Sequence, residues 1–152
     1  MTSRAHGARY VAVVGSGEAT VAELALAEEV GAQLADLGAA VVTGGLGGVM
    51  EAACRGAKSR LGLTIGLLPG LDRDEANGWV DVAIATGLGE LRNGLLVRTS
   101  DALVAIGGGA GTLSEIGFAL KIGRPVIGLG TFSADGVVEA SSAAEAAALA
   151  LR

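Results

Sequence analysis

The residue types best suited to chemistry in this chain lie in the nine-residue sequence GGGAGTLSE at positions 107–115. An apolar run precedes this sequence and a helical pattern follows it, which predicts a turn from a strand into a helix. The first N–H groups of a helix have no partner within it and lie at the positive end of its dipole, so they bind anions such as phosphate. Glycine lets the backbone approach such a ligand closely. The predicted phosphate contacts are Gly108, Gly109, Ala110, Gly111 and Thr112.

Two further glycine turns follow predicted strands. Gly15, Ser16 and Gly17 follow the apolar run at 10–14, and Gly44 and Gly45 follow the run at 39–43. Ligands of open parallel sheets lie beyond the carboxyl ends of the strands, so we expect all three turns to meet at one pocket. Each turn also has a purely structural interpretation, as a tight connection or as a site of close helix packing.

These runs belong to an alternation of short apolar segments and longer amphipathic segments that is typical of α/β proteins. Strands that are apolar throughout predict a sheet covered on both faces, and connections of helical length predict parallel pairing. We therefore predict one doubly wound, Rossmann-like α/β domain with a mainly parallel sheet over residues 10–152, after a flexible N-terminus at 1–9. The expected strands are 10–14, 39–43, 63–68, 80–85, 102–106 and 125–129, and the expected helices are 20–38, 49–60, 90–98, 116–122 and 142–151.

Composition argues against several classes of function. The 152 residues carry a formal net charge of −5 and only 3% aromatic residues, which argues against a nucleic-acid partner. Cys54 is the single cysteine and His6 the single histidine, so neither an internal disulfide nor a His/Cys metal site is expected. The apolar runs are too short for a signal peptide or a membrane span, and a cytoplasmic location is predicted.

The sequence at 107–115 resembles the PGGxGTxxE signature of the LOG-type phosphoribohydrolases, which act on cytokinin riboside monophosphates. Similar matches extend over most of residues 10–130, including GGLGGVM at 44–50 and IGLLP at 65–69. Arg92, nine residues before Asp101, matches the arginine of an R-K…A-D pair in that family. The resemblance implies a Rossmann-like fold, a nucleotide-binding site and a homodimer or higher homo-oligomer. The helices at 49–57 and 116–122 are candidates for the interface between subunits.

The chain departs from the enzymes at three positions. Gly107 stands where they have proline, Asn93 where they have lysine, and Ser114 where many have glutamate. In these details the chain is more similar to a sister branch that includes the molybdenum cofactor carrier proteins, which bind a phosphorylated pterin without transforming it. The resemblance therefore implies binding more directly than catalysis, and no additional cofactor.

Arg92 and Glu115 are the candidate catalytic residues. Glu115 could stabilise the oxocarbenium-like sugar that forms when an N-glycosidic bond is cleaved, and Arg92 could hold a phosphate or ribose hydroxyls. A second interpretation of Glu115 is structural, because Thr112 and Glu115 have the spacing of a capping box. Thr112 would then cap the helix instead of contacting the ligand.

Two functional hypotheses follow. The first is a protein that binds a phosphorylated small molecule, with a nucleoside monophosphate or the molybdenum cofactor as candidate ligands. The second is a phosphoribohydrolase that acts on nucleoside 5′-monophosphates. An oligomeric scaffold with a vestigial site is a third interpretation.

Overall fold

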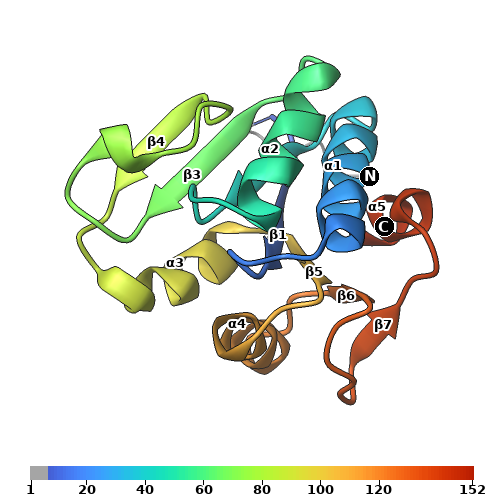
Figure 1. Cartoon of the computed structure of the whole chain (residues 1–152). Coiled ribbons are helices and arrows are strands. Elements are labelled where there is room, and N and C mark those ends of the chain that lie inside the picture. The colour runs from blue at the N-terminus through green and yellow to red at the C-terminus, as the bar shows by residue number, and fades with distance from the viewer. Residues whose placement is uncertain (1–6) are drawn as a thin grey trace.

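The computed structural model describes residues 7–152, which form one parallel β-sheet with helices on both faces (Figure 1). The strand order is β4-β3-β2-β1-β5-β6-β7, and every neighbouring pair is parallel. The strands are β1 (Tyr10–Gly15), β2 (Ala40–Thr43), β3 (Thr64–Leu68), β4 (Val82–Ala85), β5 (Ala102–Ile106), β6 (Val126–Leu129) and β7 (Val137–Glu139). The predicted doubly wound α/β class is confirmed.

Five α-helices and two short 3₁₀ helices connect these strands. The α-helices are α1 (Val21–Asp36), α2 (Val49–Ser59), α3 (Arg92–Thr99), α4 (Ala110–Lys121) and α5 (Ala143–Ala150). The 3₁₀ helices are η1 (Arg73–Glu75) and η2 (Gly89–Leu91). Thr20 caps α1 with the predicted capping box, in which the Thr20 hydroxyl accepts from the Glu23 N–H and the Glu23 carboxylate accepts from the Thr20 N–H.

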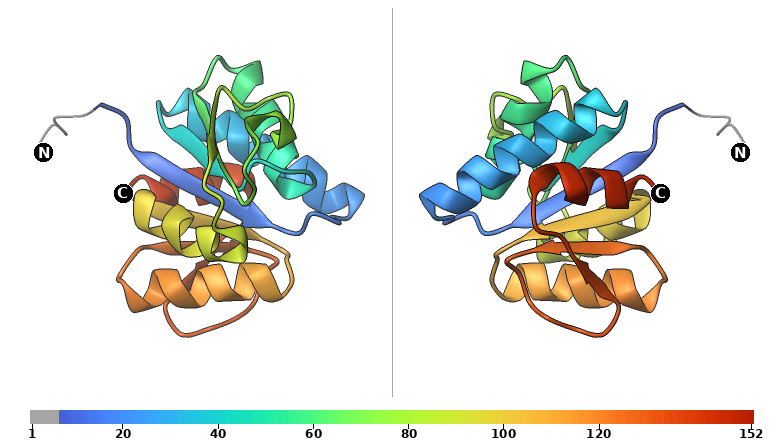
Figure 2. Two further views of the ribbon diagram at one scale, coloured as in Figure 1. Left: turned by 90° about the vertical axis from the view of Figure 1, so that its left-hand side faces the viewer. Right: turned by 90° about the vertical axis from the view of Figure 1, so that its right-hand side faces the viewer.

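Alternating side chains of the central strands build two hydrophobic cores. Val11 and Val13 of β1 belong to the core beneath α1, α2 and α5, whereas Ala12 and Val14 belong to the core beneath α3 and α4. The views in Figure 2 show the resulting three layers from two sides. Because both faces of the sheet are covered, its strands are apolar throughout. The helices cover the faces of the sheet but not the ends of its strands, so a site can form at these ends.

Glycines allow α1 and α2 to pack with their backbones in contact. A Cβ atom at Gly31 would overlap the carbonyl oxygen of Ala53, and one at Gly56 would overlap that of Glu28. The apolar side of α2 is buried in this contact and against the sheet. The suggested role of 49–57 as an interface between subunits is therefore wrong, because this face is already covered within the chain.

Several predicted boundaries differ from the structure. Helix α4 begins at Ala110 and not at 116, and helix α3 begins at Arg92 after a 3₁₀ turn. Strand β7 was not predicted, because its three residues are mostly exposed and form no apolar run. In the predicted flexible segment 1–9, residues 1–6 lie outside the described part of the chain. Arg9 donates hydrogen bonds to the carbonyl groups of Leu151 and Arg152.

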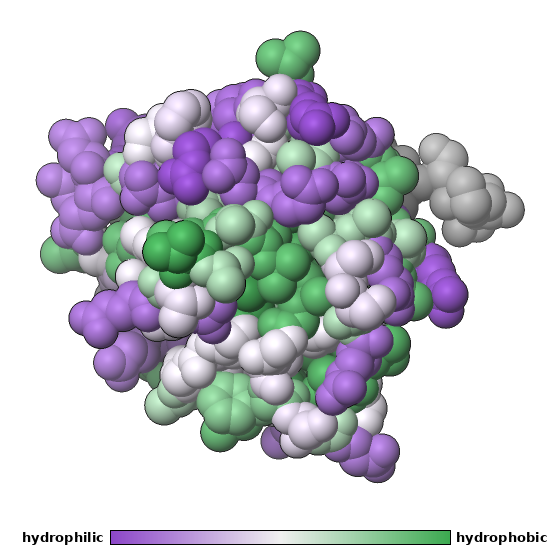
Figure 3. Space-filling view, turned by 45° about the vertical axis from the view of Figure 1, so that its right-hand side comes forward, coloured by the Kyte–Doolittle hydropathy of each residue, from purple (hydrophilic) through white to green (hydrophobic). Residues whose placement is uncertain are grey.

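The surface is mixed in character. On the face shown in Figure 3, hydrophobic residues gather toward the middle and hydrophilic residues toward the upper edge. In residues 7–152, no helix is both long enough and apolar enough to cross a membrane. Large apolar side chains are exposed at scattered positions, among them Val21, Leu61 and Leu71.

Candidate functional site

A cavity of about 250 Å³ lies at the carboxyl ends of β1, β2 and β5. Of these strands, β1 and β5 flank the point where the chain reverses its direction of progress across the sheet, from β1–β4 on one side to β5–β7 on the other. Three glycine turns converge there, as the sequence predicted. The predicted residues on the cavity wall are Gly15, Ser16, Gly17, Gly44, Arg92, Gly109, Gly111, Thr112 and Glu115.

Three other predicted contacts lie beside the cavity and not on its wall. Gly45 is packed against the Leu68 side chain, and its N–H donates to the Thr43 hydroxyl over 3.0 Å. Gly108 borders a neighbouring hollow that also includes Phe132. Ala110 is the exposed first residue of α4.

Helix α4 starts without a side-chain cap. Its N-cap is Gly109, and the first backbone bond of the helix runs from the Leu113 N–H to the Gly109 carbonyl at 3.0 Å. Within the described part of the chain, the N–H groups of Ala110, Gly111 and Thr112 therefore have no acceptor. Thr112 is in the third position of the helix, so the capping box with Glu115 is not formed. That interpretation of Glu115 was wrong.

The turn before α4 requires glycine for its backbone conformation. Gly107 has φ of +53° and Gly108 has φ of +102°, both in the region that favours glycine. This turn brings the chain into helical geometry by Ala110, earlier than the capping pattern indicated. The Thr131 hydroxyl donates to the Gly107 carbonyl over 2.6 Å and holds the turn. Proline, which the LOG-type enzymes have at the position of Gly107, has a fixed negative φ and does not fit this conformation.

Arg92 lies at the start of α3 and spans the ends of two strands. Its Nε donates to the Leu67 carbonyl at 2.9 Å, Nη2 donates to the Gly44 carbonyl at 3.5 Å, and Nη1 donates to the Asn93 side-chain oxygen. The guanidinium thus fixes the Gly44 turn as one wall of the cavity. Burial lowers the pKa of Arg92, whereas the nearby Glu115 raises it. The group stays charged at physiological pH.

Asp101, which the resemblance paired with Arg92, lies at the opposite end of the sheet. Its carboxylate accepts a hydrogen bond from the Tyr10 N–H at 2.8 Å, at the start of β1. Arg92 is at the carboxyl ends of the strands, so the two residues do not share a site. Asp101 therefore aligns β5 with β1 and is not part of the cavity.

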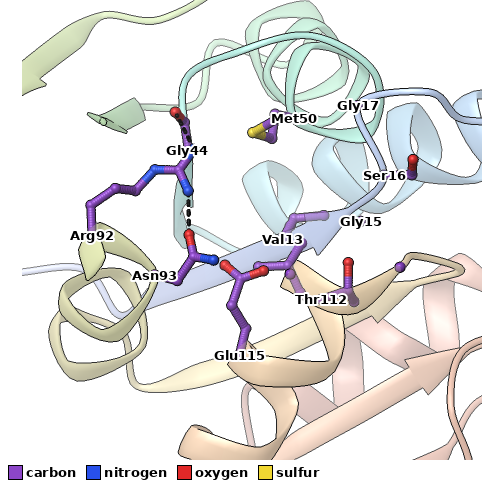
Figure 4. A pocket seen from close by; sticks show the side chains of 13 residues that line it. Val13, Gly15, Ser16, Gly17, Gly44, Met50, Arg92, Asn93, Thr112 and Glu115 are labelled. Carbon is purple, nitrogen blue, oxygen red and sulfur yellow. Dashed lines mark hydrogen bonds between the residues drawn. The ribbon is translucent and has the colours of Figure 1, made fainter. Parts of the chain in front are cut away.

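Glu115 is buried, with 8% of its surface exposed, and its side chain points from α4 into the cavity (Figure 4). A helical side chain leans toward the N-terminus of its helix, which brings this carboxyl group toward the first turn of α4. Burial raises its pKa from 4.5 to about 7, although the positive charge of Arg92 acts in the opposite direction. No group in residues 7–152 donates a hydrogen bond to it, so the carboxyl group is available to a ligand.

Four residues of the cavity wall were missed in the sequence. Asn93 lies between Arg92 and Glu115 in Figure 4, and Met50, Val13 and Val14 complete the apolar part of the wall. The only signal for Asn93 was its place in the resemblance, where the enzymes have lysine. The three apolar residues have no signal that distinguishes them from core residues.

Other chemical groups do not add to the site. Cys54 is buried, its sulfur lies 3.5 Å from the Thr43 hydroxyl, and burial raises the pKa of its thiol. A buried thiol with a raised pKa is a poor nucleophile. Across the described residues, no three His, Cys, Asp or Glu side chains gather into a group that could hold a metal ion.

Known proteins share this fold along most of the chain. The model of the SLOG cluster4 family matches residues 8–151. The molybdenum cofactor binding protein of the phototrophic bacterium Rippkaea orientalis is 38% identical, with 95% of this chain and 96% of that chain covered and a TM-score of 0.90. The molybdenum cofactor carrier protein of Chlamydomonas reinhardtii is 38% identical, with 93% and 94% covered and a TM-score of 0.85. An uncharacterized protein of Archaeoglobus fulgidus is 45% identical over 119 residues, which are 78% of each chain.

Proposed function

The chain belongs to the SLOG cluster4 family, and we propose that it binds a phosphorylated small molecule of the nucleotide or pterin type, with the molybdenum cofactor among the candidates. The family match and the two neighbours confirm the resemblance to the LOG superfamily and its molybdenum cofactor carrier branch. The observation that carries the proposal is the uncapped start of α4 at the wall of the cavity.

The chemistry of the cavity suits an anionic ligand. The open N–H groups of Ala110, Gly111 and Thr112 would bind the phosphate, assisted by the positive end of the α4 dipole. Gly109, which precedes these groups, has no side chain, and the space around it is open. The turn of Gly15, Ser16 and Gly17 forms the opposite wall (Figure 4). A terminal phosphate of a nucleotide or of a pterin cofactor would occupy the same position.

The test is a single substitution that blocks the start of α4. Gly109→Val should fold, because a Cβ atom there meets nothing within 4 Å. We expect its branched side chain, directly before Ala110, to hinder the approach of an anion to the open N–H groups. The wild type should gain melting temperature with phosphate, and more with AMP or GMP, through mass action. Gly109→Val should lose this gain. Gly117→Ala, in the same helix and also with open space around it, is the matched control.

The melting shifts of the two variants distinguish the proposed site from a site elsewhere. Loss of the ligand-dependent shift in Gly109→Val, with the shift kept in Gly117→Ala, supports the proposed site. A full shift in Gly109→Val would place the phosphate elsewhere. Purified protein from cells that make molybdenum cofactor can also be assayed for molybdenum and for pterin fluorescence, which distinguishes a cofactor cargo from a nucleotide.

A specific observation favours a second candidate function, the hydrolysis of nucleoside 5′-monophosphates. A carboxyl group with a pKa of about 7 lies on the wall of the cavity and has no hydrogen-bond partner among residues 7–152. Such a group can exchange a proton near neutral pH, as general acid–base catalysis requires. Release of adenine from AMP by the wild type, and its loss in Glu115→Gln, would support this function. Binding of AMP without release of base would exclude AMP as a substrate.

We also propose that the protein acts in the cytoplasm as a homo-oligomer. Helices α3 and α4 pack against each other and leave Leu95 and Leu113 exposed at 40% and 47%. Leu91, just before α3, is 79% exposed. These side chains offer an apolar face for a second copy of the chain. Light scattering should give a mass above that of the monomer, and Leu113→Glu should lower it.

A further inference from the structure

We propose that Glu115 and the phosphate group of a bound ligand hold one proton between them, so that the ligand enters the cavity together with a proton from solution. This coupling makes the affinity of the site depend on pH. The inference rests on the proposed binding function and adds a regulation of the same site. It is carried by a buried carboxyl group that shares one cavity with the open N–H groups of α4.

Glu115 and the proposed phosphate site lie on the same side of α4. Gly111 and Thr112 come four and three residues before Glu115, which places them one helical turn away on the same side of the helix. The Glu115 side chain points into the cavity that Gly111 and Thr112 also line (Figure 4). Gly111 has no side chain that could separate the carboxyl group from this end of the helix. A phosphate at the open N–H groups would therefore be a close neighbour of the carboxyl group.

Two negative groups in one small cavity repel each other strongly. The cavity has a volume of about 250 Å³ and Glu115 is buried in its wall, so water screens this repulsion little. A phosphate monoester is close to doubly charged at neutral pH, because its second pKa is about 6. Where two acidic groups share a site, one of them keeps a proton. The carboxylate, the phosphate dianion and one proton from solution thus form the complex, with the proton on a Glu115 oxygen or on the nearest phosphate oxygen.

The charges around Glu115 attract an anion most when this carboxyl group is neutral. Arg92, from α3, is the other charged residue on the described wall of the cavity, and its charge acts on Glu115. The wall residues from β1, from the turns after β1 and β2, from α2 and from the start of α4 are uncharged, and β5 is apolar throughout. An ionised Glu115 offsets the charge of Arg92 and leaves the dipole of α4 to attract the anion. Protonation of Glu115 leaves the charge of Arg92 uncompensated.

The pH range of this coupling follows from the state of Glu115 before the ligand binds. Burial raises the pKa of the free carboxyl group from 4.5 to about 7, so this group loses most of its charge below that pH and is ionised above it. The negative charge of the phosphate raises the pKa further in the complex. Binding above pH 7 therefore takes up a proton, and the affinity falls as the pH rises.

The experiment measures proton uptake during the binding of AMP by titration calorimetry at pH 8. Titrations in buffers of different ionisation enthalpy give the number of protons taken up, which should be about 0.7 to 1 for the wild type. The affinity of the wild type for AMP should fall about tenfold or more between pH 7 and pH 9. Glu115→Gln, whose side chain stays neutral, should bind AMP at pH 7, take up less than about 0.2 protons and keep its affinity at pH 9 to within about threefold. Glu29→Gln removes an exposed carboxylate of α1 and, as the matched control, should keep the uptake.

Failure of the inference is distinguishable from failure of the proposed function. If AMP binds to the wild type without proton uptake, or with an affinity that does not fall above pH 7, the phosphate site stands and the shared proton is refuted. Uptake that Glu115→Gln retains would assign the proton to another group and refutes the inference as well. So does a folded Glu115→Gln that does not bind AMP at pH 7, because the neutral side chain is the binding form. The uptake by the wild type needs no substitution and decides the case in which Glu115→Gln does not fold. If the wild type does not bind AMP at any of these pH values, the proposed function and this inference both fail.

Discussion

The replacement of Glu115 by glutamine should change how the stability of the protein depends on pH. In the folded protein, burial raises the pKa of Glu115 to about 7 from an ordinary value of 4.5. The folded state therefore holds the proton more tightly than the unfolded state between these values. The contribution of Glu115 to the free energy of unfolding is most favourable below about pH 4.5. This contribution is lost as the pH rises through 7. Glutamine is never charged and removes this contribution.

The magnitude follows from the two pKa values. One pH unit of difference corresponds to about 1.4 kcal/mol, so the charged carboxylate destabilises the fold by about 3 kcal/mol at high pH. Between pH 5 and pH 8 the unfolding free energy of the wild type, relative to Glu115→Gln, should fall by about 2 to 3 kcal/mol.

The assay is urea unfolding followed by circular dichroism at pH 5, 6, 7 and 8, without phosphate in the buffer. Wild type and Glu115→Gln are compared with Glu29→Gln, which removes an exposed carboxylate of α1 and serves as the control. Parallel curves for wild type and Glu115→Gln would contradict a raised pKa of Glu115, because Glu115 would then titrate alike in the folded and unfolded states.

Three further predictions concern the packing of α1 on α2, the turn before α4 and the Arg92 side chain, and urea unfolding tests each of them. Gly31→Ala should destabilise the protein by about 2 kcal/mol or more through overlap with the Ala53 carbonyl, whereas Gly117→Ala, in an open helical position, should stabilise it by about 0.5 to 1 kcal/mol. Similar effects for the two would contradict the close packing of α1 on α2. Gly108→Ala should lower the free energy of unfolding by about 1 kcal/mol or more, because Gly108 has φ of +102° and a Cβ atom there would overlap the Thr112 side chain. An unchanged midpoint of urea unfolding would argue against the conformation of this turn. Arg92→Lys should lower the free energy of unfolding by about 1 to 2 kcal/mol, because lysine cannot bond to the Leu67 and Gly44 carbonyls and to Asn93 at the same time. A stability equal to the wild type would show that these bonds are not needed.

Local sequence signals predicted much of the fold. The capping box of Thr20 and Glu23, the buried strand β5 and the glycine turns each depend on neighbouring residues, and all are present in the structure. The start of α4 was misplaced because its capping pattern at Thr112 and Glu115 competes with the turn at Gly107. That turn is held by Thr131, which is distant in the sequence. A short exposed strand such as β7 has too little apolar character to be recognised alone.

The candidate site was predictable only in part. The convergence of Gly15, Gly44 and Gly109 follows from the parallel sheet, whose strand ends lie along one edge. By contrast, whether the Glu115 carboxyl group can contact a ligand depends on the residue at which α4 begins. The place of Asn93 on the cavity wall depends on where α3 begins, which only the folded structure reveals.

Nuclear magnetic resonance can show whether the cavity at the start of α4 binds a phosphorylated small molecule. The backbone amide signals of the chain are followed during a titration with GMP. We expect the amides of Gly109, Ala110, Gly111 and Thr112 to shift most, with smaller changes in the turn at Ser16 and Gly17. Saturating GMP that leaves these amides unchanged, or that shifts mainly residues remote from the cavity, would contradict it.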